Sequence, residues 1–178
     1  MVEALSAMQP PTARHFVPPP GGRPDRPKAS AVMGIFAHHP DLSTAFFHFN
    51  GHILYGTTLS IRQRELLVLR IAVLRKSPYL WAQHLVHTKD AEISQSDVSR
   101  IAFGPGAPYL DALERAMLQA VDELILLGEI GGDTWAELQR DLTTQQILDL
   151  IFTVGCYDII AWVCGTLQFD LEPDLPAP

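Results

Sequence analysis

The sequence predicts an all-α protein, a compact bundle of about seven to eight helices behind a proline-rich N-terminal arm. Over most of the chain, apolar residues recur three and four positions apart, and no alternating pattern reaches the length of a convincing strand. Ser, Thr or Asp residues stand before several of these periodic segments, where a helix needs an N-cap. A composition of 47% hydrophobic and 19% charged residues over 178 positions suits one soluble domain.

In the first half of the chain we expect a short helix over Val32, Ile35 and Phe36 that ends before His39-Pro40, followed by helices over residues 41–56, 61–75 and 79–91. Ser30 can cap the first helix, and Asp41 opens the second, which Gly56 ends. Ser60 is a good N-cap for the third, whose apolar residues are spaced as on one buried helix face. Pro78 suits the first turn of the fourth helix, because a proline there loses no helical hydrogen bond.

In the second half we expect helices over residues 97–103, 109–127, 134–142 and 144–167. Ser94 and Thr143 are placed to cap the first and the last of them. A Gly-Pro-Gly-Ala-Pro loop at 104–108 separates the first two, and Gly128 stops the second.

The two ends of the chain are expected to differ from this helical region. Residues 1–28 hold seven of the fourteen prolines, a density that denies the backbone regular hydrogen bonding. This arm is predicted to be extended or disordered, and it could fold over the active site or over a neighbouring subunit. Residues 29–172 are expected to form a single helical domain, and residues 173–178 an ordinary tail.

Charge and the N-terminal sequence limit the partners and the location. The net charge is −7, the isoelectric point is about 5.4, and no run of Lys or Arg offers a footprint for phosphates. We therefore expect no nucleic-acid partner. The first nine residues lack a basic start, and Glu3 interrupts their apolar stretch, so no secretory signal is visible. A cytoplasmic protein is the expectation.

The apolar segment 147–169 raises the question of a membrane span. Asp149 and Asp158 lie within it, and a charge deep in a bilayer costs at least about 2.5–3.5 kcal/mol. A buried core helix is therefore the better interpretation, and no membrane partner is expected. Cys156 and Cys164 lie eight positions apart on this segment, roughly 12 Å along a helix, too far for a disulfide between them. Both are predicted to be small buried side chains.

The most informative stretch is Leu59-Ser-Ile-Arg-Gln-Arg-Glu-Leu-Leu-Val-Leu-Arg-Ile-Ala72, followed by Tyr79-Leu-Trp-Ala-Gln-His84. Supporting stretches are His39-Pro-Asp-Leu42, Ala120-Val-Asp-Glu-Leu124 with Thr134-Trp135, and Val154-Gly155 with Tyr157. In order and spacing, these segments resemble the carboxymuconolactone decarboxylase and alkylhydroperoxidase D-like family over about residues 30–172. The resemblance implies an all-helical fold and a homo-oligomer, usually a trimer or a hexamer.

The branches of that family differ at two positions. The redox branch carries a Glu, a Cys twelve residues later, a second Cys three further on, and a His four after that. In this chain these positions hold Glu65, Ser77, Leu80 and His84, so the two thiols of a thiol peroxidase are missing from them. The decarboxylase-like branch often has Glu where this chain has Leu80, and that departure indicates a changed or lost reaction.

On that resemblance, His84 is the best proton donor, Glu65 could orient it, and Tyr79 could donate to an oxyanion. Arg64, or alternatively Arg62, could hold a substrate carboxylate. The remaining substrate-binding candidates are Trp81 and Trp135 as apolar walls, Leu80, and His48 and His52 at a pocket edge. Each also has a plain alternative, as a core histidine, an ion pair, a packing aromatic or a surface residue.

No metal or other cofactor is expected. His48 and His52, like His84 and His87, are spaced to share a helix face, as metal ligands often are. No Glu-x-x-His or His-Glu-x-x-His pattern accompanies them, and the family resemblance implies no metal.

The leading hypothesis is a cofactor-free acid/base enzyme, a lyase that acts on a carboxylated lactone or a β-keto acid. One alternative is a biosynthetic tailoring enzyme, a cyclase, dehydratase or isomerase, acting on a larger apolar substrate. Leu80 and the cluster Phe46, Phe47 and Phe49 favour that alternative by making a more apolar pocket. A third hypothesis is a non-catalytic ligand-binding or assembly protein.

Overall fold

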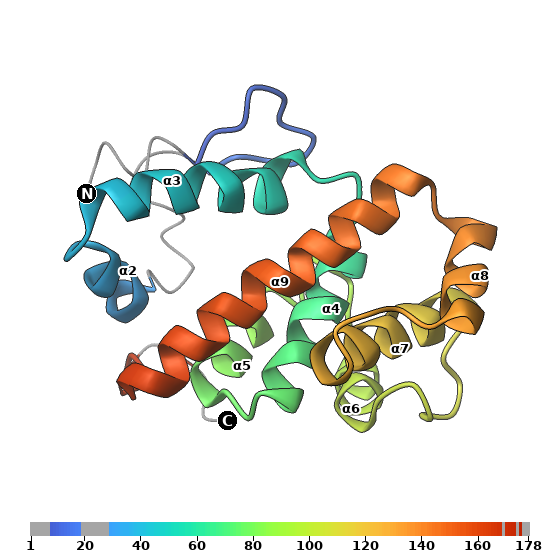
Figure 1. Ribbon diagram of the computed structural model, residues 1–178. Coiled ribbons are helices and arrows are strands. Elements are labelled where there is room, and N and C mark those ends of the chain that lie inside the picture. Colours follow the sequence, from blue (N-terminus) through green and yellow to red (C-terminus); the bar gives the residue numbers. More distant parts are fainter. Residues whose placement is uncertain (1–7, 19–28, 169, 174, 176–178) are drawn as a thin grey trace.

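The computed structural model describes residues 8–18, 29–168, 170–173 and 175 of the chain, and these residues contain helices and no strand. Eight of the helices are α-helical and one short turn is a π-helix, which confirms the predicted all-α class (Figure 1). They are α2 (Ser30–Phe36), α3 (Pro40–Gly51), the π-helix η1 (His52–Gly56), α4 (Ile61–Leu74), α5 (Pro78–Leu85), α6 (Gln95–Phe103), α7 (Ala112–Leu126), α8 (Gly132–Asp141) and α9 (Thr144–Leu167).

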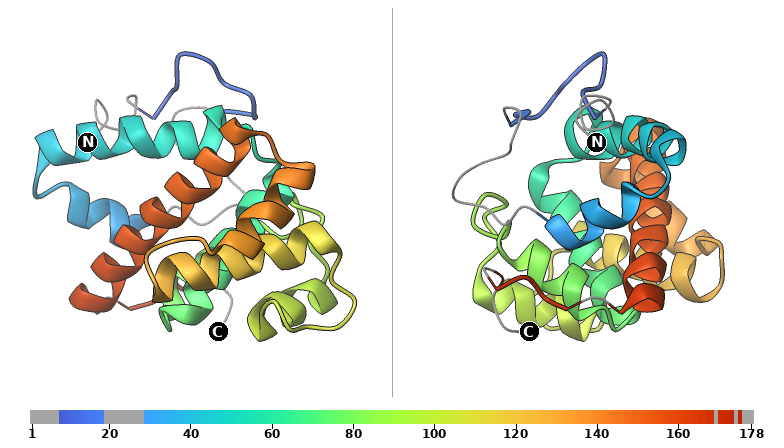
Figure 2. Two further views of the ribbon diagram at one scale, coloured as in Figure 1. Left: turned by 45° about the vertical axis from the view of Figure 1, so that its right-hand side comes forward. Right: turned by 90° about the vertical axis from the view of Figure 1, so that its left-hand side faces the viewer.

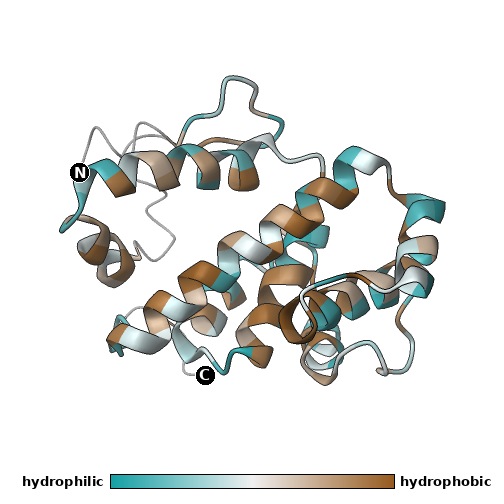
Figure 3. Ribbon diagram, viewed as in Figure 1, coloured by the Kyte–Doolittle hydropathy of each residue, from teal (hydrophilic) through white to brown (hydrophobic). Residues whose placement is uncertain are grey.

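Helix α4 forms the centre of the core. It contacts α5, α6, α7 and α9, and Leu66, Leu67, Leu69 and Ile71 are all buried on it. Each buried side chain of this kind contributes about 1.5–3 kcal/mol to folding before entropy is subtracted. Helix α9 runs diagonally across the molecule, with α2 and α3 on one side and α6 to α8 on the other (Figures 1 and 2). Apolar residues occur along α4 and along much of α9 (Figure 3).

Three of the predicted helix N-caps are confirmed by their hydrogen bonds. Ser60, Ser94 and Thr143 each accept a hydrogen bond from the third residue of their helix, and that residue's side chain accepts one from the cap's backbone N–H. Such a reciprocal capping box satisfies two backbone donors that the first turn leaves unpaired. The positions of α4, α6 and α9 along the chain are therefore encoded locally.

Several helix boundaries differ from the sequence prediction, among them the start of α6 at Gln95, two residues early. Helix α5 ends at Leu85, six residues early, and Glu92 in the following turns has a positive φ of 53°. Helix α7 begins at Ala112, because Tyr109 has a φ of 63° and Asp111 caps the helix through the Glu114 N–H. Helix α8 begins at Gly132, two residues early, and α3 begins at Pro40, with the His39 side chain as its cap.

The predicted helix 41–56 ends at Gly56 as expected. It is not α-helical throughout, because its last five residues form the π-helix η1. The carbonyl oxygens of this turn accept hydrogen bonds from outside it. Leu54 accepts from Arg64 at 2.6 Å, and Tyr55 accepts from the backbone N–H groups of Arg14 and His15. These tertiary partners satisfy carbonyl oxygens that the end of a helix leaves without an intrahelical donor.

The proline-rich arm is described only in part, because residues 1–7 and 19–28 lie outside the described residues. Residues 8–18 run beside α3 and η1 (Figure 1). Near the other end of the chain, the Glu172 carboxylate accepts hydrogen bonds from the Ala31 N–H at 2.8 Å and the Tyr79 hydroxyl at 2.9 Å. This carboxylate joins the residues after α9 to α2 and α5.

Helix α9 is long and apolar enough to cross a membrane by length and composition, and half of its apolar window is buried inside the protein. Its inner residues Ile147, Leu150 and Val154 belong to the main core. Asp158 on this helix forms an ion pair with Arg75 at 2.5 Å. The helix therefore serves here as a core element.

Cys156 and Cys164 are free and buried, as predicted. Burial raises the pKa of both thiols to about 11.

Candidate active site

A cavity of about 320 Å³ opens between the N-terminal arm, η1, α4 and the end of α5. Ligand pockets typically have volumes of about 300–1,000 Å³, so this one suits a small molecule. Its lining combines apolar residues with a group of ionisable side chains. The lining residues are His15, Phe16, Pro18, Leu54, Tyr55, Ile61, Arg64, Glu65, His84, His87 and Asp90.

Glu65 is a fully buried carboxylate in this lining. Its Oε2 lies 2.6 Å from His84 Nδ1, and its Oε1 accepts from Arg64 Nε at 3.1 Å and Nη2 at 3.0 Å. Burial alone would raise the pKa of Glu65, but His84, Arg64 and His87 outweigh it and lower the pKa to about 2. Glu65 is therefore ionised at neutral pH, held by two basic side chains.

His84 lies in the last turn of α5 and meets Glu65 across the contact between α5 and α4. Because an ionised carboxylate can only accept, Nδ1 donates to Glu65, and this hydrogen bond sets the tautomer. Nε2 is then the ring nitrogen for chemistry in the cavity. Tyr157 packs edge-on against the imidazole, with ring centroids 5.0 Å apart and an interplanar angle of 85°.

Arg64 lines the same cavity, but most of its contacts are internal. Two of its nitrogens bond to Glu65, and Nη1 donates to the Leu54 carbonyl at 2.6 Å. These bonds use three of the five guanidinium N–H groups. The arrangement suits balancing the Glu65 charge more directly than the predicted capture of a substrate carboxylate.

Four further ionisable residues of the cavity, His15, Tyr55, His87 and Asp90, were not assigned to the site from sequence. The His87 ring lies 5.6 Å from the His84 ring, centroid to centroid. Tyr55 lines the cavity from η1, and burial raises the pKa of its phenol more than Arg64 lowers it. A phenol that stays protonated can donate a hydrogen bond to an oxyanion. A histidine one turn after His84 was a sequence signal, whereas nothing in the pattern pointed to Tyr55.

Several predicted site residues lie elsewhere. The Tyr79 hydroxyl donates to Glu172, and burial together with that carboxylate raises its pKa. Leu80 is buried in the main core. Trp81 lines a separate hollow of about 270 Å³, with Ala72, Val73, Lys76, Ser77 and Pro78.

The remaining candidates are also outside the cavity lining. Trp135 on α8 is 37% exposed, and His48 is exposed on α3. His52 Nε2 lies 2.8 Å from Asp149 Oδ1 on α9. Phe46 and Phe47 pack with Phe36, and Phe49 with Phe152, so this aromatic cluster does not make the pocket apolar as expected.

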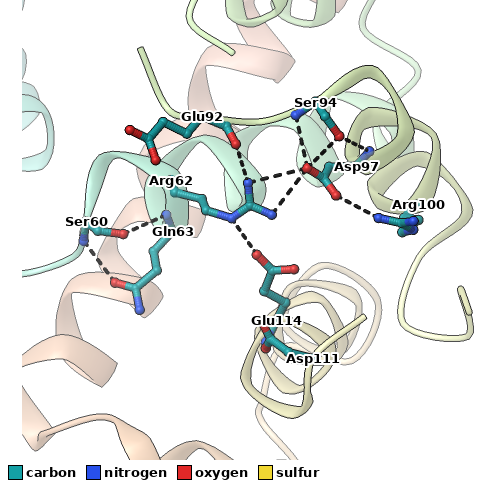
Figure 4. Close-up of polar contacts among 9 residues, drawn as sticks. All are labelled: Ser60, Arg62, Gln63, Glu92, Ser94, Asp97, Arg100, Asp111 and Glu114. Atoms are coloured by element: carbon teal, nitrogen blue, oxygen red, sulfur yellow. Dashed lines mark hydrogen bonds and ion pairs between the residues drawn. The ribbon is translucent and has the colours of Figure 1, made fainter. Parts of the chain in front are cut away.

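Arg62, the alternative carboxylate anchor, belongs to a polar network between α4, α6 and α7 (Figure 4). Its Nε donates to Glu114 at 2.7 Å, and its Nη1 donates to the Glu92 carbonyl at 2.7 Å. Asp97, which also closes the capping box of α6, lies 3.5 Å away. Arg62 therefore joins three helices rather than facing the cavity.

Within the part of the chain that the structure describes, no group of three or more His, Cys, Asp or Glu side chains is arranged to hold a metal ion. In each of the two histidine pairs noted in the sequence, one histidine contacts a carboxylate instead. His52 pairs with Asp149, and His84 pairs with Glu65.

Comparison with solved structures finds the same fold. A protein of unknown function from Agrobacterium tumefaciens, proposed to be the antioxidant defence protein AhpD, superposes with a TM-score of 0.72 at 15% identity, covering 79% of this chain and 97% of that one. An uncharacterized peroxidase-related protein from Silicibacter sp. TM1040 gives 0.71 at 17% identity, with 80% and 76% covered. An uncharacterized peroxidase-related protein from Ralstonia eutropha JMP134, an alkylhydroperoxidase AhpD core, gives 0.68 at 16% identity, with 92% and 94% covered.

Among curated proteins, the chain has no match. The model of the carboxymuconolactone decarboxylase family matches residues 40–123, the stretch that holds Glu65, His84 and most of the cavity. This match and the shared helical fold support the resemblance of the chain to the carboxymuconolactone decarboxylase and alkylhydroperoxidase D-like family.

Proposed function

We propose that the protein is a cofactor-free acid/base enzyme in which Glu65 and His84 move a proton on a small carbonyl substrate. The observation that carries this proposal is the 2.6 Å contact between a buried, ionised Glu65 and a histidine that lines a ligand-sized cavity. The carboxylate holds one ring nitrogen and stabilises the imidazolium when the other nitrogen takes up a proton.

A carboxylated lactone or a β-keto acid is the proposed substrate class. In decarboxylation, the bond between the α-carbon and the carboxylate breaks, carbon dioxide leaves, and the electron pair forms an enolate. Protonated His84 then gives its Nε2 proton to the α-carbon and recovers a proton from solvent. In this proposal Tyr55, which lines the same cavity, donates a hydrogen bond to the enolate oxygen, the role that the sequence suggested for Tyr79.

Thiol peroxidase chemistry is not part of this proposal. Ser77 and Leu80 stand where the redox branch has its cysteines. Cys156 and Cys164 are buried, and their raised pKa keeps them as thiols, whereas peroxide reduction needs a thiolate. The two similar solved structures named as peroxidase-related share the fold at 16–17% identity, which supports no transfer of that activity.

Biosynthetic tailoring, as a cyclase, dehydratase or isomerase, is the second candidate. The apolar share of the cavity lining favours it, because Phe16, Pro18, Leu54 and Ile61 surround the polar group. Enolisation by the same Glu65 and His84 would serve such a reaction equally well.

We also propose that the protein assembles with copies of itself through the outer face of α9. Leu148, Phe152, Ile159 and Trp162 are each 42–56% exposed there, at spacings of four, seven and three residues that keep them on one face. Light scattering after size exclusion should report a trimer or hexamer that Phe152→Glu dissociates, and a monomeric wild type would contradict this. We also propose a cytoplasmic location.

The deciding experiment is a decarboxylation screen by carbon dioxide release and ultraviolet spectra, using 4-carboxymuconolactone and several β-keto acids. Wild-type turnover should fall about 10²–10⁴-fold in His84→Ala. His48→Ala, an exposed histidine outside the cavity lining, should keep wild-type activity. Equal activity in His84→Ala and the wild type would refute the proposal. No turnover of these substrates by the wild type would move the search to tailoring reactions.

A further inference from the structure

One wall of the cavity comes from outside the helices. Residues 8–18 run beside α3 and η1 (Figure 1), and His15, Phe16 and Pro18 line the cavity that also holds His84. Among the described residues of the arm, these three line the cavity of the proposed active site. The family model begins only at residue 40, so this wall lies outside the part that it matches.

The arm is attached to the helices by specific backbone hydrogen bonds. The N–H groups of Arg14 and His15 donate to the Tyr55 carbonyl at 2.6 and 3.0 Å. His15 Nε2 lies 2.9 Å from the carbonyl oxygen of Leu59, which can only accept, so Nε2 carries the proton in this contact. Because these bonds end directly before Phe16, they determine where its ring meets the cavity.

A glycine in α3 makes room for the same segment. A Cβ added at Gly51 would lie 2.1 Å from the Met8 carbonyl oxygen and 2.8 Å from the Met8 Cα, both backbone atoms. At Gly155, also inside a helix, an added Cβ would meet nothing within 4 Å. Position 51 therefore has to be glycine while the arm is attached, and position 155 has no such requirement.

Phe16 is 70% exposed although it lines the cavity. An exposed aromatic ring at a pocket is apolar surface that a ligand can cover, and ring-to-ring contacts add to that gain. Leu54 and Ile61 extend the apolar lining, and Glu65 and His84 belong to the same cavity. Its volume of about 320 Å³ is at the small end for ligand sites, which suits one ring with a short acid side chain.

We propose that residues 8–18 form a substrate-selecting wall, and that Phe16 binds an aromatic or unsaturated ring of the substrate beside the carbonyl on which His84 acts. The inference deepens the proposed function, on which the identity of the reacting carbonyl rests. The binding of the ring depends on Phe16 and the attached arm and needs no turnover. Phe16 is thus a specificity-determining residue, and the substrate class narrows to ring-bearing acids.

The first test is calorimetric titration with 3-phenylpropionate and with the open-chain acid hexanoate. The wild type should prefer the ring acid, and Phe16→Ala should weaken its binding about three- to tenfold while leaving hexanoate binding unchanged. Phe103→Ala removes an equally exposed ring, 71% against 70%, from outside the cavity lining and should change neither affinity. Equal effects of Phe16→Ala on both acids, or no effect, would overturn the proposal.

The second test detaches the wall without altering a lining residue. Gly51→Ala should abolish the preference for the ring acid, because its methyl group displaces the backbone at Met8, whereas Gly155→Ala should retain the preference. If Gly51→Ala does not fold, His15→Ala loosens the same segment by removing the bond to Leu59, although it also alters one lining residue. A folded variant with a detached arm and the wild-type preference would show that the wall does not select the substrate.

The two proposals fail separately. Loss of the ring preference in Phe16→Ala, with no decarboxylation by the wild type, would retain the ring-binding wall and discard the reaction. Turnover that depends on His84, with equal affinity for both acids in the wild type, would retain the reaction and discard the wall.

Discussion

The protein contains two histidine–carboxylate pairs with similar geometry and different surroundings. His84 Nδ1 lies 2.6 Å from Glu65, and the two side chains are 10% and 1% exposed. His52 Nε2 lies 2.8 Å from Asp149, but the His52 side chain is 51% exposed. In both pairs the carboxylate pKa is lowered against the effect of burial, to about 2 at Glu65.

The other bonds of each carboxylate explain the difference in role. Asp149 accepts from the backbone N–H of Thr58 at 2.6 Å and from its hydroxyl at 2.7 Å, which fastens the residues after η1 to α9. Glu65 instead accepts from the charged Arg64, and its histidine faces a cavity. A short contact between histidine and carboxylate therefore does not identify an active site. Burial of both partners beside a ligand-sized cavity is the distinguishing feature.

The largest effect should come from making the two carboxylates neutral. Glu65→Gln should lower kcat/KM for the substrate found in the screen about 10²–10⁴-fold, because a side-chain amide no longer enforces the His84 tautomer or stabilises an imidazolium. Asp149→Asn, the matched change in the other pair, should leave kcat/KM unchanged. Equal losses in steady-state kinetics would remove the functional distinction between the pairs.

The second-largest difference between the two pairs should appear in the free energy of unfolding. Glu65→Ala leaves the buried Arg64 without its carboxylate, so the free energy of unfolding should fall by about 3–5 kcal/mol. Asp149→Ala frees the Thr58 donors near the surface and should cost about 1–3 kcal/mol. Urea denaturation followed by circular dichroism measures both. A larger loss in Asp149→Ala would reverse the order proposed here.

Lowering the pH should remove the stability that the Glu65 pair contributes, and it should do so within a defined pH range. Its pKa is lowered from 4.5 to about 2 in the folded protein, so the unfolded chain binds this proton more readily. The stability from Glu65 is fully present above about pH 4.5 and is lost as the pH falls towards 2. Urea midpoints between pH 6 and pH 2 should therefore fall more steeply in the wild type than in Glu65→Gln. Parallel curves would argue against an ionised Glu65 in the folded state.

The smallest effect is expected at the exposed histidine. His52→Ala should lower the free energy of unfolding by at most about 1 kcal/mol, because its half-exposed side chain forms a solvent-screened pair. A double-mutant cycle over His52 and Asp149 should give a coupling energy of the same size. A coupling as large as that between His84 and Glu65, measured in the same way, would show that burial does not control the strength of these pairs.

Much of the helical pattern could be predicted because its signals are local. Ser60, Ser94 and Thr143 cap the helices that were expected to follow them, through side chains three residues along the chain. Glu65 and His84 were also found from their sequence context. Their pairing follows from the short connection between α4 and α5, which allows the two helices to pack against each other.

The rest of the site could not be found in this way. Tyr79, Leu80 and Trp81 precede His84 on the same helix, yet all three contact other parts of the protein. Leu80 and Trp81 are spaced to share a helix face with His84, so it is the packing around α5 that decides which side chain reaches the cavity. Leu80 therefore does not make the cavity more apolar, as was expected of it, because it is buried in the main core. Introducing Glu there would place a charge in the main core rather than beside a substrate.

The sequence by itself determined the all-helical class, the main helix starts and the Glu65–His84 pair, since periodicity, caps and short spacings act over a few residues. Only the tertiary structure decided that Tyr55 replaces Tyr79 in the cavity, that Arg64 serves Glu65, and that the arm supplies Phe16. These contacts join residues far apart in the chain, and their formation depends on how helices and arm pack together.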